Sequence, residues 1–399
     1  MSVQASQWEI LKCLLANARQ LTIKPSLNLF FLNYLRRFRV QKAGKHLILH
    51  SHLPPLNHPA YARFVDLHLR QKVSGPSHAQ IGVTNACPQR CVYCYNQGRT
   101  GRIMDQAKLL QVIRELKDLG VVWLGITGGE PLLQKHLPEL IASAGPDCAV
   151  KLFTTGCGLT HRLAYELKDA GLFSVSVSLD HWDEAVHNRN RRYPQAYAEA
   201  LRAIEIFKCV GGLHVGVSTV LSDDMLKPDR VERFLQFVTS LGADEAWLSE
   251  TKPAVAAHGG RVIAQEEWQA LVKFQDAWNR AHNLTMNYLG HFEDAAHFGC
   301  NAGHKMVYID AFGEVSPCVF TPMSFGNILL QPVKTVFEDM RAHFPSENSC
   351  FINAHYHRLQ ATAAGSNILT AAQTKRLVKN LKFGPYSKFY QLYYGRRSS

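Results

Sequence analysis

Short apolar runs alternate with longer amphipathic segments through most of the chain. The runs have the length and composition of buried strands, and the segments between them, such as residues 106–119, repeat apolar positions at helical spacing. Strands separated by single helices are joined by crossovers into a parallel sheet. The pattern therefore predicts an α/β fold with six parallel strands: Gln80 to Val83, Val121 to Ile126, Val150 to Gly156, Ser174 to Asp180, Leu213 to Val220 and Ala246 to Ser249.

Three cysteines follow the first predicted strand within a few residues of one another. Cys87, Cys91 and Cys94 have the spacing C-x3-C-x2-C, and Tyr93 precedes the last of them. Iron-sulfur clusters are held by cysteine thiolates, normally four, so three on one loop indicate a cluster in which one iron is left for another ligand. The alternative is a zinc site that a remote fourth ligand completes.

This cysteine motif resembles the core motif of the radical S-adenosylmethionine (radical SAM) enzymes. The resemblance implies that a catalytic 4Fe-4S cluster on Cys87, Cys91 and Cys94 binds SAM through its open iron, with Tyr93 near the adenine. The cluster would cleave SAM with one electron, and the 5'-deoxyadenosyl radical would take a hydrogen atom from a substrate. The implied fold is a partial (β/α)6 TIM-like barrel whose site lies at the carboxyl ends of the strands.

Further segments resemble the parts of these enzymes that contact SAM. Thr127-Gly-Gly-Glu-Pro131 follows the second predicted strand and is similar to the family's GGEP segment. Residues 187–197 resemble the stretch whose arginine binds the SAM carboxylate, but Arg192 and Gln195 replace the family's glycines, so Arg189 remains an alternative to Arg191. The SAM-contacting residues implied by the resemblance, besides Tyr93, are Gly128, Gly129, Glu130, Pro131, Thr155, Ser176, Ser178, Asp180 and Arg191.

A second set of cysteines, Cys300, Cys318 and Cys350, lies beyond the predicted barrel. The spacing C-x12-G-x4-C from Cys300 through Gly313 to Cys318 predicts a β-hairpin with a thiolate near each end. The segment resembles the start of SPASM and Twitch domains, which implies one auxiliary iron-sulfur cluster on these three cysteines. Its fourth ligand stays open between His355 or His357, a substrate atom and a distant cysteine, and structural zinc is the alternative.

The remaining cysteines and the start of the chain indicate in which cellular compartment the protein is expected. Four cysteines occur in apolar or helical contexts that are typical of core residues: Cys13, Cys148, Cys157 and Cys209. The sequence begins without the charged and apolar regions of a secretory leader. We therefore expect free thiols in the cytoplasm, with the inner membrane surface as a further option.

Positive charge is concentrated at the two ends of the chain. The net charge is +12, and residues 1–75 carry 11 Lys and Arg against 2 acids, while residues 366–399 carry 7 against none. Residues 7–19 show one apolar helical face, residues 27–39 join an apolar run to a basic cluster, and residues 375–397 interleave aromatic and basic residues. The apolar runs are shorter than the ~20 residues that span a bilayer, but such helices can lie in its interface.

The expected partner of these basic ends is an anionic surface or substrate. A peripheral membrane surface, or a small-molecule or lipid-linked anion, fits better than nucleic acid, because no RNA-binding signature is present. In the alternative interpretation the apolar faces pack on the barrel and the charges only solvate the surface. The histidines of the proline-broken segment 50–59 predict a polar loop more readily than a metal site.

Four regions are predicted: a basic helical extension and linker (1–75), a radical SAM partial barrel (76–285), a SPASM/Twitch-like auxiliary-cluster domain (286–365) and a basic aromatic tail (366–399). The expected function is radical SAM chemistry on an anionic or lipid-linked metabolite, with a flavodoxin or ferredoxin as electron donor. A ribosomal-peptide maturase and a non-catalytic zinc protein that binds nucleic acid or membrane are the alternatives. No catalytic residue is assigned, and Trp247, Glu250 and Lys252 are candidates for substrate contact.

Overall fold

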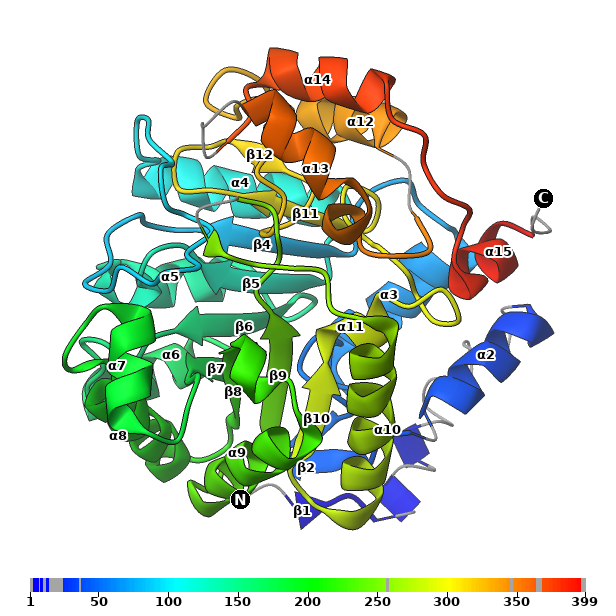
Figure 1. The fold of residues 1–399 in the computed structure, drawn as a ribbon. Helices are drawn as coiled ribbons and strands as arrows, with labels where there is room; N and C mark the ends of the chain where they lie inside the picture. Colours follow the sequence, from blue (N-terminus) through cyan, green and yellow to red (C-terminus); the bar gives the residue numbers. More distant parts are fainter. Residues whose placement is uncertain are drawn as a thin grey trace.

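A nine-stranded sheet forms the centre of the molecule, and helices cover its outer face (Figure 1). The computed structural model describes residues 3–6, 8–9, 12–13, 24–35, 37–255, 258–344, 347–363 and 368–395. The strand order is β10-β9-β8-β7-β6-β5-β4-β11-β12. The strands are β4 (His78–Gly82), β5 (Trp123–Thr127), β6 (Ala149–Thr154), β7 (Leu172–Ser178), β8 (His214–Leu221), β9 (Glu245–Glu250), β10 (Thr285–Tyr288), β11 (Met306–Ile309) and β12 (Val315–Ser316).

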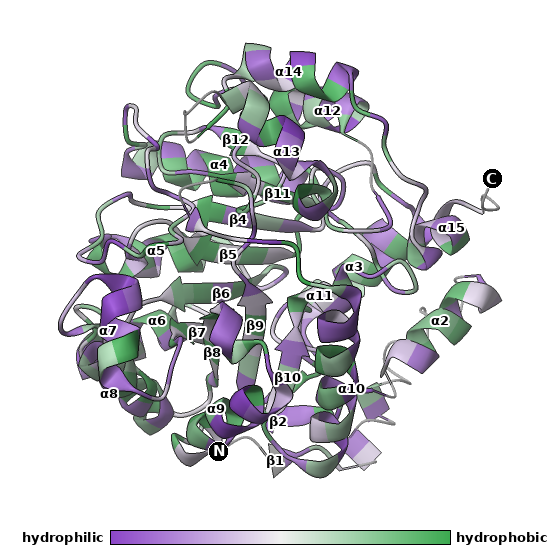
Figure 2. Cartoon of the chain, in the orientation of Figure 1, coloured by the Kyte–Doolittle hydropathy of each residue, from purple (hydrophilic) through white to green (hydrophobic). Residues whose placement is uncertain are grey.

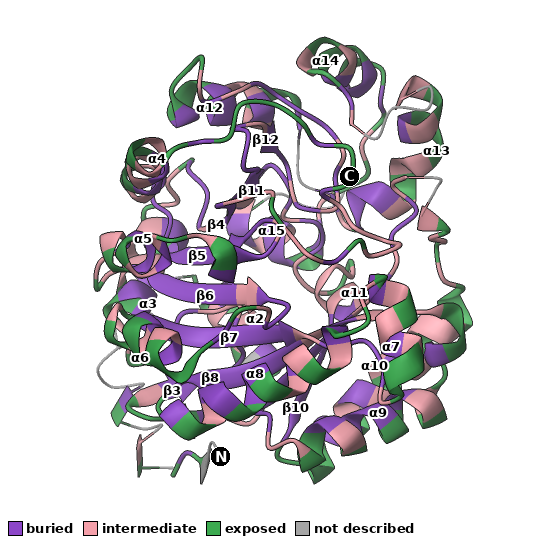
Figure 3. Cartoon of the chain, turned by 90° about the vertical axis from the view of Figure 1, so that its left-hand side faces the viewer, coloured by how far each residue is buried: buried purple, intermediate pink, exposed green. Residues whose placement is uncertain are grey.

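The predicted α/β partial barrel is confirmed, because β4 to β9 pair in chain order as six parallel strands. The connecting helices are α4 (Gln106–Asp118), η3 (Pro131–Leu133), α5 (Leu137–Ser143), α6 (His161–Asp169), α7 (Glu184–Arg191), α8 (Ala196–Val210), η4 (Asp223–Met225), α9 (Pro228–Ser240) and α10 (Gln265–Ala281). Figure 3 shows that the strands are buried beneath the partly exposed helices. Because the helices bury one face of the strands and the barrel interior buries the other, the strands are nearly continuous apolar runs.

Local sequence signals fix where several of these helices begin. Asp105, Thr160 and Asp183 stand just before α4, α6 and α7, and each side chain accepts a hydrogen bond from a backbone N–H of the first turn. These caps satisfy amide groups that have no partner within the helix. Pro228 opens α9, where the missing N–H costs nothing.

The hairpin of the second cysteine set extends the same sheet. Strands β11 and β12 pair antiparallel on either side of Gly313, as the spacing predicted. However, β11 also pairs parallel with β4, with Met306 opposite His78, and β10 adds to the other edge beside β9. The sheet therefore continues across residue 285, and the four regional boundaries stay predictions. The helices that follow are α11 (Leu289–Phe292), α12 (Val333–His343), α13 (Phe351–Ala363), α14 (Ala371–Lys379) and α15 (Lys388–Tyr394).

The amino-terminal segment closes the barrel at the amino ends of its strands. Residues 50–58 form a loop, as predicted, but Ser51 is fully buried. Its backbone N–H donates to Glu245 Oε2 (2.8 Å), its carbonyl accepts from Trp123 Nε1 (2.8 Å), and its hydroxyl contacts Lys151 and Glu245. The elements of this region are β1 (Val3–Gln4), α2 (Pro25–Leu35), β2 (Gln41–Ala43), β3 (His46–Ile48), α3 (Pro59–Phe64) and the π-helix η2 (Val65–Arg70).

Replacing Ser51 with alanine should destabilise the protein by about 1–3 kcal/mol, because the buried Glu245 and Lys151 side chains would lose a shared hydrogen-bond partner. The free energy of unfolding in urea measures the effect. Ser143→Ala is the matched control, since the Ser143 hydroxyl only caps a carbonyl on a partly buried helix end. An equal, small loss for both variants would contradict a special role of Ser51.

Helix α2, near the start of the chain, and helix α15, near its end, meet at one edge of the molecule. Helices α2 and α15 lie side by side there (Figure 1), and they contact each other through an aromatic cluster that includes Phe30, Phe31 and Phe389. Most of the helix expected over residues 7–19 lies outside the described residues. Within the described residues no helix is long and apolar enough to cross a membrane.

Candidate functional site

Cys87, Cys91 and Cys94 lie together on the loop that follows the carboxyl end of β4. All three are free, partly buried thiols. Burial raises the pKa of Cys87 to about 12 and that of Cys91 to about 11, so bound metal would have to favour their thiolate forms. Among the described residues no group of three or more Cys, His, Asp or Glu side chains forms a site for a single metal ion. A four-iron cluster makes a different demand, because each thiolate binds its own iron.

The GGEP segment holds one side of this loop through the backbone. Gly129 N–H donates to the Thr84 carbonyl and Glu130 N–H to the Ala86 carbonyl, both at 2.7 Å. A Cβ on Gly129 would stand 2.3 Å from the Ala86 oxygen, so only glycine allows the approach. Gly128 has a φ of 130°, a conformation that also requires glycine. The two glycines thus fix the cysteine loop whatever else they contact.

Glu130 is fully buried and joins the ends of two strands. Its carboxylate accepts hydrogen bonds from Thr154 Oγ1 (2.6 Å), the Thr155 N–H (2.6 Å), the Leu132 N–H (3.0 Å) and the Thr155 hydroxyl. Burial raises the pKa of Glu130 although these donors favour its anion. The side chain therefore has a structural role in this structure, and its contact with SAM stays a prediction.

The opposite side of the cysteine loop rests on the end of α7. The backbone N–H groups of Arg90 and Val92 donate to the carbonyls of Arg191 and Asn190, both at 3.1 Å. Arg192 ends the helix in the left-handed conformation, with a φ of 49°. The family's glycine at this position has such a conformation without cost, so Arg192 preserves the turn at an energetic penalty.

A buried ion pair lies beside the loop. Arg191 donates from Nε and Nη2 to the two oxygens of Asp180 at 2.8 and 2.9 Å, and the Tyr93 hydroxyl bonds the same carboxylate. Burial would raise the pKa of Asp180, but the neighbouring guanidinium outweighs it and holds that pKa below its usual value. Gln89, next to the cysteines, accepts from Arg191 Nη1 at 3.4 Å. The ion pair of Arg191 and Asp180 thus holds Tyr93 and the cysteine loop in place.

Arg189 and Arg191 occupy different places. Arg189 is exposed and lines a depression between α7 and α9, together with Arg230, Arg233 and Trp182. Arg191 instead faces Asp180 and the cysteine loop. The structure therefore brings Arg191 and not Arg189 beside the predicted cluster.

The serines of β7 point into the barrel. Val175 and Val177 pack in the main hydrophobic core, so the alternate residues Ser176 and Ser178 face the other way. The buried Ser176 hydroxyl has no hydrogen-bond partner among the described residues, and buried hydroxyls are normally satisfied by protein, water or ligand. Together with the three thiols on a fixed loop, this unpaired hydroxyl fits a bound cluster and SAM. Pro131 and Thr155 are buried next to Glu130.

Cys300, Cys318 and Cys350 are close enough to influence one another's ionisation. Burial raises the pKa of all three thiols; the charges of Cys350 and Cys318 add to the shift of Cys300, and that of Cys318 adds to the shift of Cys350. Lys252 lies beside them, buried at the end of β9, and its Nζ donates to Glu250 and Glu293, both at 2.9 Å. The structure therefore gathers the three predicted auxiliary ligands and two of the predicted substrate-contact residues.

The structure also distinguishes the other predicted residues near this set. His355 Nε2 pairs with the Glu347 carboxylate at 3.1 Å, and His357 is exposed against Tyr356. Trp247 points to the opposite end of the barrel, where its Nε1 donates to Glu245 Oε1 at 2.7 Å. Trp247 therefore lies with the amino-terminal segment and not with the cysteines.

Sequence reasoning missed the residues that connect the two cysteine sets. Asn96 donates to the Gly128 carbonyl and accepts from the Tyr308 hydroxyl of β11 at 2.9 Å. Arg99 forms a buried ion pair with Asp310 at 2.9 Å. These contacts join the loop after Cys94 to the auxiliary hairpin. No periodicity or spacing in the sequence indicates the Asn96–Tyr308 and Arg99–Asp310 contacts, because the residues of each pair are more than 200 positions apart in the chain.

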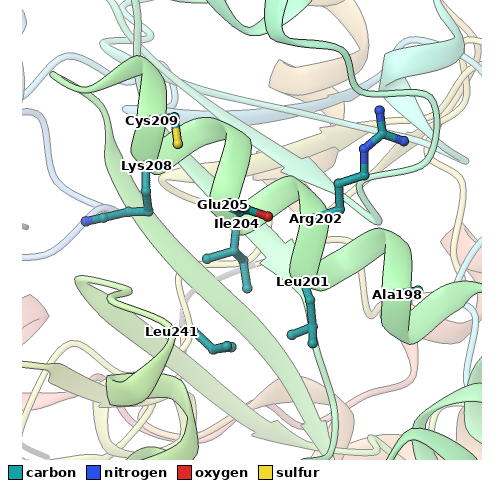
Figure 4. A pocket seen from close by; sticks show the side chains of 8 residues that line it. All are labelled: Ala198, Leu201, Arg202, Ile204, Glu205, Lys208, Cys209 and Leu241. Carbon is teal, nitrogen blue, oxygen red and sulfur yellow. The ribbon is translucent and has the colours of Figure 1, made fainter.

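A further depression lies on the outer side of α8 (Figure 4). Its lining includes Leu201, Arg202, Lys208 and Leu241, and none of its lining residues belongs to the strand ends or to either cysteine set. The candidate site is therefore defined by the cysteine loop and its contacts and not by a surface hollow.

A parallel partial barrel with three cysteines at its carboxyl end, and a second set beyond it, defines an iron-sulfur α/β-barrel protein. The family model of the Radical SAM superfamily matches residues 81–237, and the SPASM model, an iron-sulfur cluster-binding domain, matches residues 300–357. Residues 81–237 are therefore a domain of the radical SAM superfamily, whose members are enzymes, and residues 300–357 are a SPASM domain. These domains imply a 4Fe-4S cluster, SAM and additional iron-sulfur ligation.

Curated relatives match part of the chain. The chain is 33% identical over 199 residues to a probable GTP 3',8-cyclase of Methanopyrus kandleri, covering 47% of this chain and 63% of the relative. It is also 33% identical over 186 residues to the PqqA peptide cyclase of Streptomyces rochei, covering 45% and 50%. The matches span less than two thirds of either relative.

Solved structures share the fold at low identity. Streptococcus suis SuiB, solved with its precursor peptide SuiA, aligns with a TM-score of 0.55 at 15% identity, covering 66% of this chain and 65% of SuiB. The anSMEcpe protein with bound AdoMet aligns with a TM-score of 0.55 at 14% identity, covering 80% and 96%. Both support the partial-barrel fold.

Proposed function

We propose that the protein cleaves SAM reductively and removes a hydrogen atom from an anionic substrate. When bound, the cluster supplies the electron and SAM supplies the 5'-deoxyadenosyl radical. The observation that carries the proposal is the loop of Cys87, Cys91 and Cys94, held between the GGEP segment and the end of α7 by paired backbone hydrogen bonds. A loop fixed on both sides suits a cluster that must keep one iron accessible.

The chain's own residues would bind, orient and enclose the reactants. Cys87, Cys91 and Cys94 hold the cluster as thiolates, and the barrel interior near Ser176 and Ser178 receives SAM. Asp180 and Arg191 keep Tyr93 in place, and Tyr93 would lie near the adenine of bound SAM. The buried surroundings limit access of water to the radical.

The auxiliary cysteines and Lys252 form the far side of the proposed substrate region. Cys300, Cys318 and Cys350 would hold one cluster, and the buried Lys252 ammonium stands between them and the end of β9. A buried cation near two acidic side chains can exchange one of them for a substrate anion. This exchange, with the positive charge of the chain ends, supports an anionic or lipid-linked metabolite.

A peptide is the second candidate substrate. The similarity to a PqqA peptide cyclase and the shared fold with SuiB, which was solved with a precursor peptide, favour it. Radical SAM enzymes also need an electron donor, and a flavodoxin or ferredoxin would fill that role in the cytoplasm.

The test is anaerobic reconstitution followed by an iron and sulfide count and an assay of 5'-deoxyadenosine from SAM with dithionite. We expect about eight irons per chain and formation of 5'-deoxyadenosine. Added anionic metabolites and peptides should then be compared for stimulation of the cleavage. Bound zinc in place of iron, or no 5'-deoxyadenosine, would contradict the proposal and favour the zinc-protein alternative.

Replacing Cys300, Cys318 and Cys350 together with alanine should lower the iron content by about half while SAM cleavage without substrate continues. The two cysteine sets occupy different loops, so the catalytic loop keeps its own contacts. The measurement is the iron count together with uncoupled 5'-deoxyadenosine formation. An unchanged iron count would show that these cysteines hold no cluster.

A further inference from the structure

The outer face of α2 exposes two leucines in a helix without charges. Leu29 and Leu32 are 59% and 52% exposed, and residues three apart lie on the same side of a helix. No acidic or basic residue occurs between Pro25 and Leu35. Figure 2 shows hydrophobic colouring in the middle of this helix, at the edge of the molecule. Contiguous exposed apolar side chains can mark an interaction surface, and these two leucines lie on one side of one helix.

The inner face of α2 is firmly packed, which fixes the direction of the leucines. Leu27 is fully buried, and the rings of Phe30 and Phe31 lie 5.8 and 6.0 Å from that of Phe389 in α15. Phe30 also meets Phe298 edge-on at 5.5 Å. The helix cannot rotate its leucines inward without exposing this aromatic cluster.

Cations from both ends of the chain surround the helix pair. Lys24 precedes α2 and lies near the end of α15. A Cβ placed on Gly395, which ends α15, would stand 3.1 Å from the Nζ of Lys24. Lys72 lies nearby, but its ammonium donates to the Tyr393 carbonyl of α15 and is partly buried there. Lys388 is exposed on α15. The sequence contains no acid in residues 24–39 or 366–399.

We propose that the face formed by the helix pair α2 and α15, with the exposed Leu29 and Leu32 and the exposed lysines Lys24 and Lys388, binds the surface of an anionic lipid bilayer. The helix is about 16 Å long, so it lies in the interface and does not cross the membrane. The two leucines enter the headgroup boundary, and the lysines attract anionic lipids. Each contribution alone is weak, and stable binding needs both.

The face is joined to the auxiliary cysteines. Ser387, which caps α15, donates from its hydroxyl to the Phe298 carbonyl at 2.7 Å, and Cys300 follows Phe298 by two residues. A Cβ on Gly299 would stand 2.7 Å from Ser387. If the proposed function holds, a bilayer bound at α2 and α15 would present a lipid-linked substrate to the part of the chain that carries this cysteine set. The binding itself needs neither cluster nor SAM, so it is independent of the proposed function.

The test is flotation of the full-length protein with vesicles of phosphatidylcholine, alone or mixed with phosphatidylglycerol. The wild type should bind only the mixed vesicles, and binding should fall as salt rises. Leu29→Gln/Leu32→Gln should weaken binding by about tenfold or more, since glutamine keeps helix propensity but removes the apolar contact. Leu330→Gln is the matched control, because Leu330 is 83% exposed outside this face.

A second pair of variants separates charge from apolar contact. Lys24→Gln/Lys388→Gln should weaken binding and reduce its salt dependence, and circular dichroism should show that all variants remain folded. Equal binding of the leucine variant and the wild type, or no binding to the mixed vesicles, would overturn the proposal. A wild-type dimer that the leucine substitutions dissociate would overturn it too, and would assign the face to a second copy of the chain.

Discussion

Replacing Cys87, Cys91 and Cys94 together with alanine should abolish 5'-deoxyadenosine formation and lower the iron content from about eight to about four per chain. The three thiols are the cysteines of the loop that the GGEP segment and α7 hold in place. Without their thiolates no iron can be retained beside Ser176 and Asp180. The measurements are the iron count, the visible absorption of the cluster and the yield of 5'-deoxyadenosine with dithionite.

Cys209→Ala is the matched control for this variant. Cys209 is also a free thiol, but it is exposed on α8, where it lines the depression in Figure 4. It should leave both iron and cleavage unchanged. Residual cleavage in the triple variant would show that the cluster is bound elsewhere, and equal loss in the control would indicate non-specific binding of iron.

Replacing Asp180 with asparagine should destabilise the folded protein by about 3–5 kcal/mol, because Arg191 would remain buried without its counter-charge. Asparagine has nearly the same shape, so the loss reports the charge and not a cavity. We expect Tyr93 and the cysteine loop to lose order as well, with a lower yield of reconstituted cluster. Urea denaturation under anaerobic conditions and the iron count measure the two effects.

The pH dependence of this loss has a definite sign. The pKa of Asp180 is lower in the folded protein than in the unfolded chain, although burial opposes the shift, because Arg191 favours the anion. The ion pair therefore contributes fully above the ordinary carboxyl pKa, and its contribution is lost as the pH falls below about 4. The difference between wild type and Asp180→Asn should shrink in that range.

An exposed ion pair provides the comparison. Arg162 and Glu166 stand one helical turn apart on α6, and Arg162 is 88% exposed. Glu166→Gln should cost less than about 0.5 kcal/mol at any of these pH values. A loss for Asp180→Asn as small as this would show that Arg191 is not confined beside Asp180.

The sequence determined the features that depend on short-range patterns. Period and length predicted the six parallel strands, and the structure confirms them; parallel strands that are buried on both faces have nearly continuous apolar sequences. The spacing of Cys87, Cys91 and Cys94 placed three thiolates on one loop, since so few residues cannot separate them widely. The hairpin around Gly313 followed from alternation and a glycine turn in the same way.

The tertiary structure alone decided which distant segments touch. No sequence pattern predicts that β11 pairs with β4 or that Ser51 is buried between Lys151 and Glu245. Nor does a pattern predict that Arg191, and not Arg189, faces Asp180. Helices α2 and α15 likewise share one edge of the molecule only because their aromatic side chains pack together. Such contacts arise when the whole chain closes around its core, and the free energy of that closure is distributed over many residues and is not encoded in any single motif.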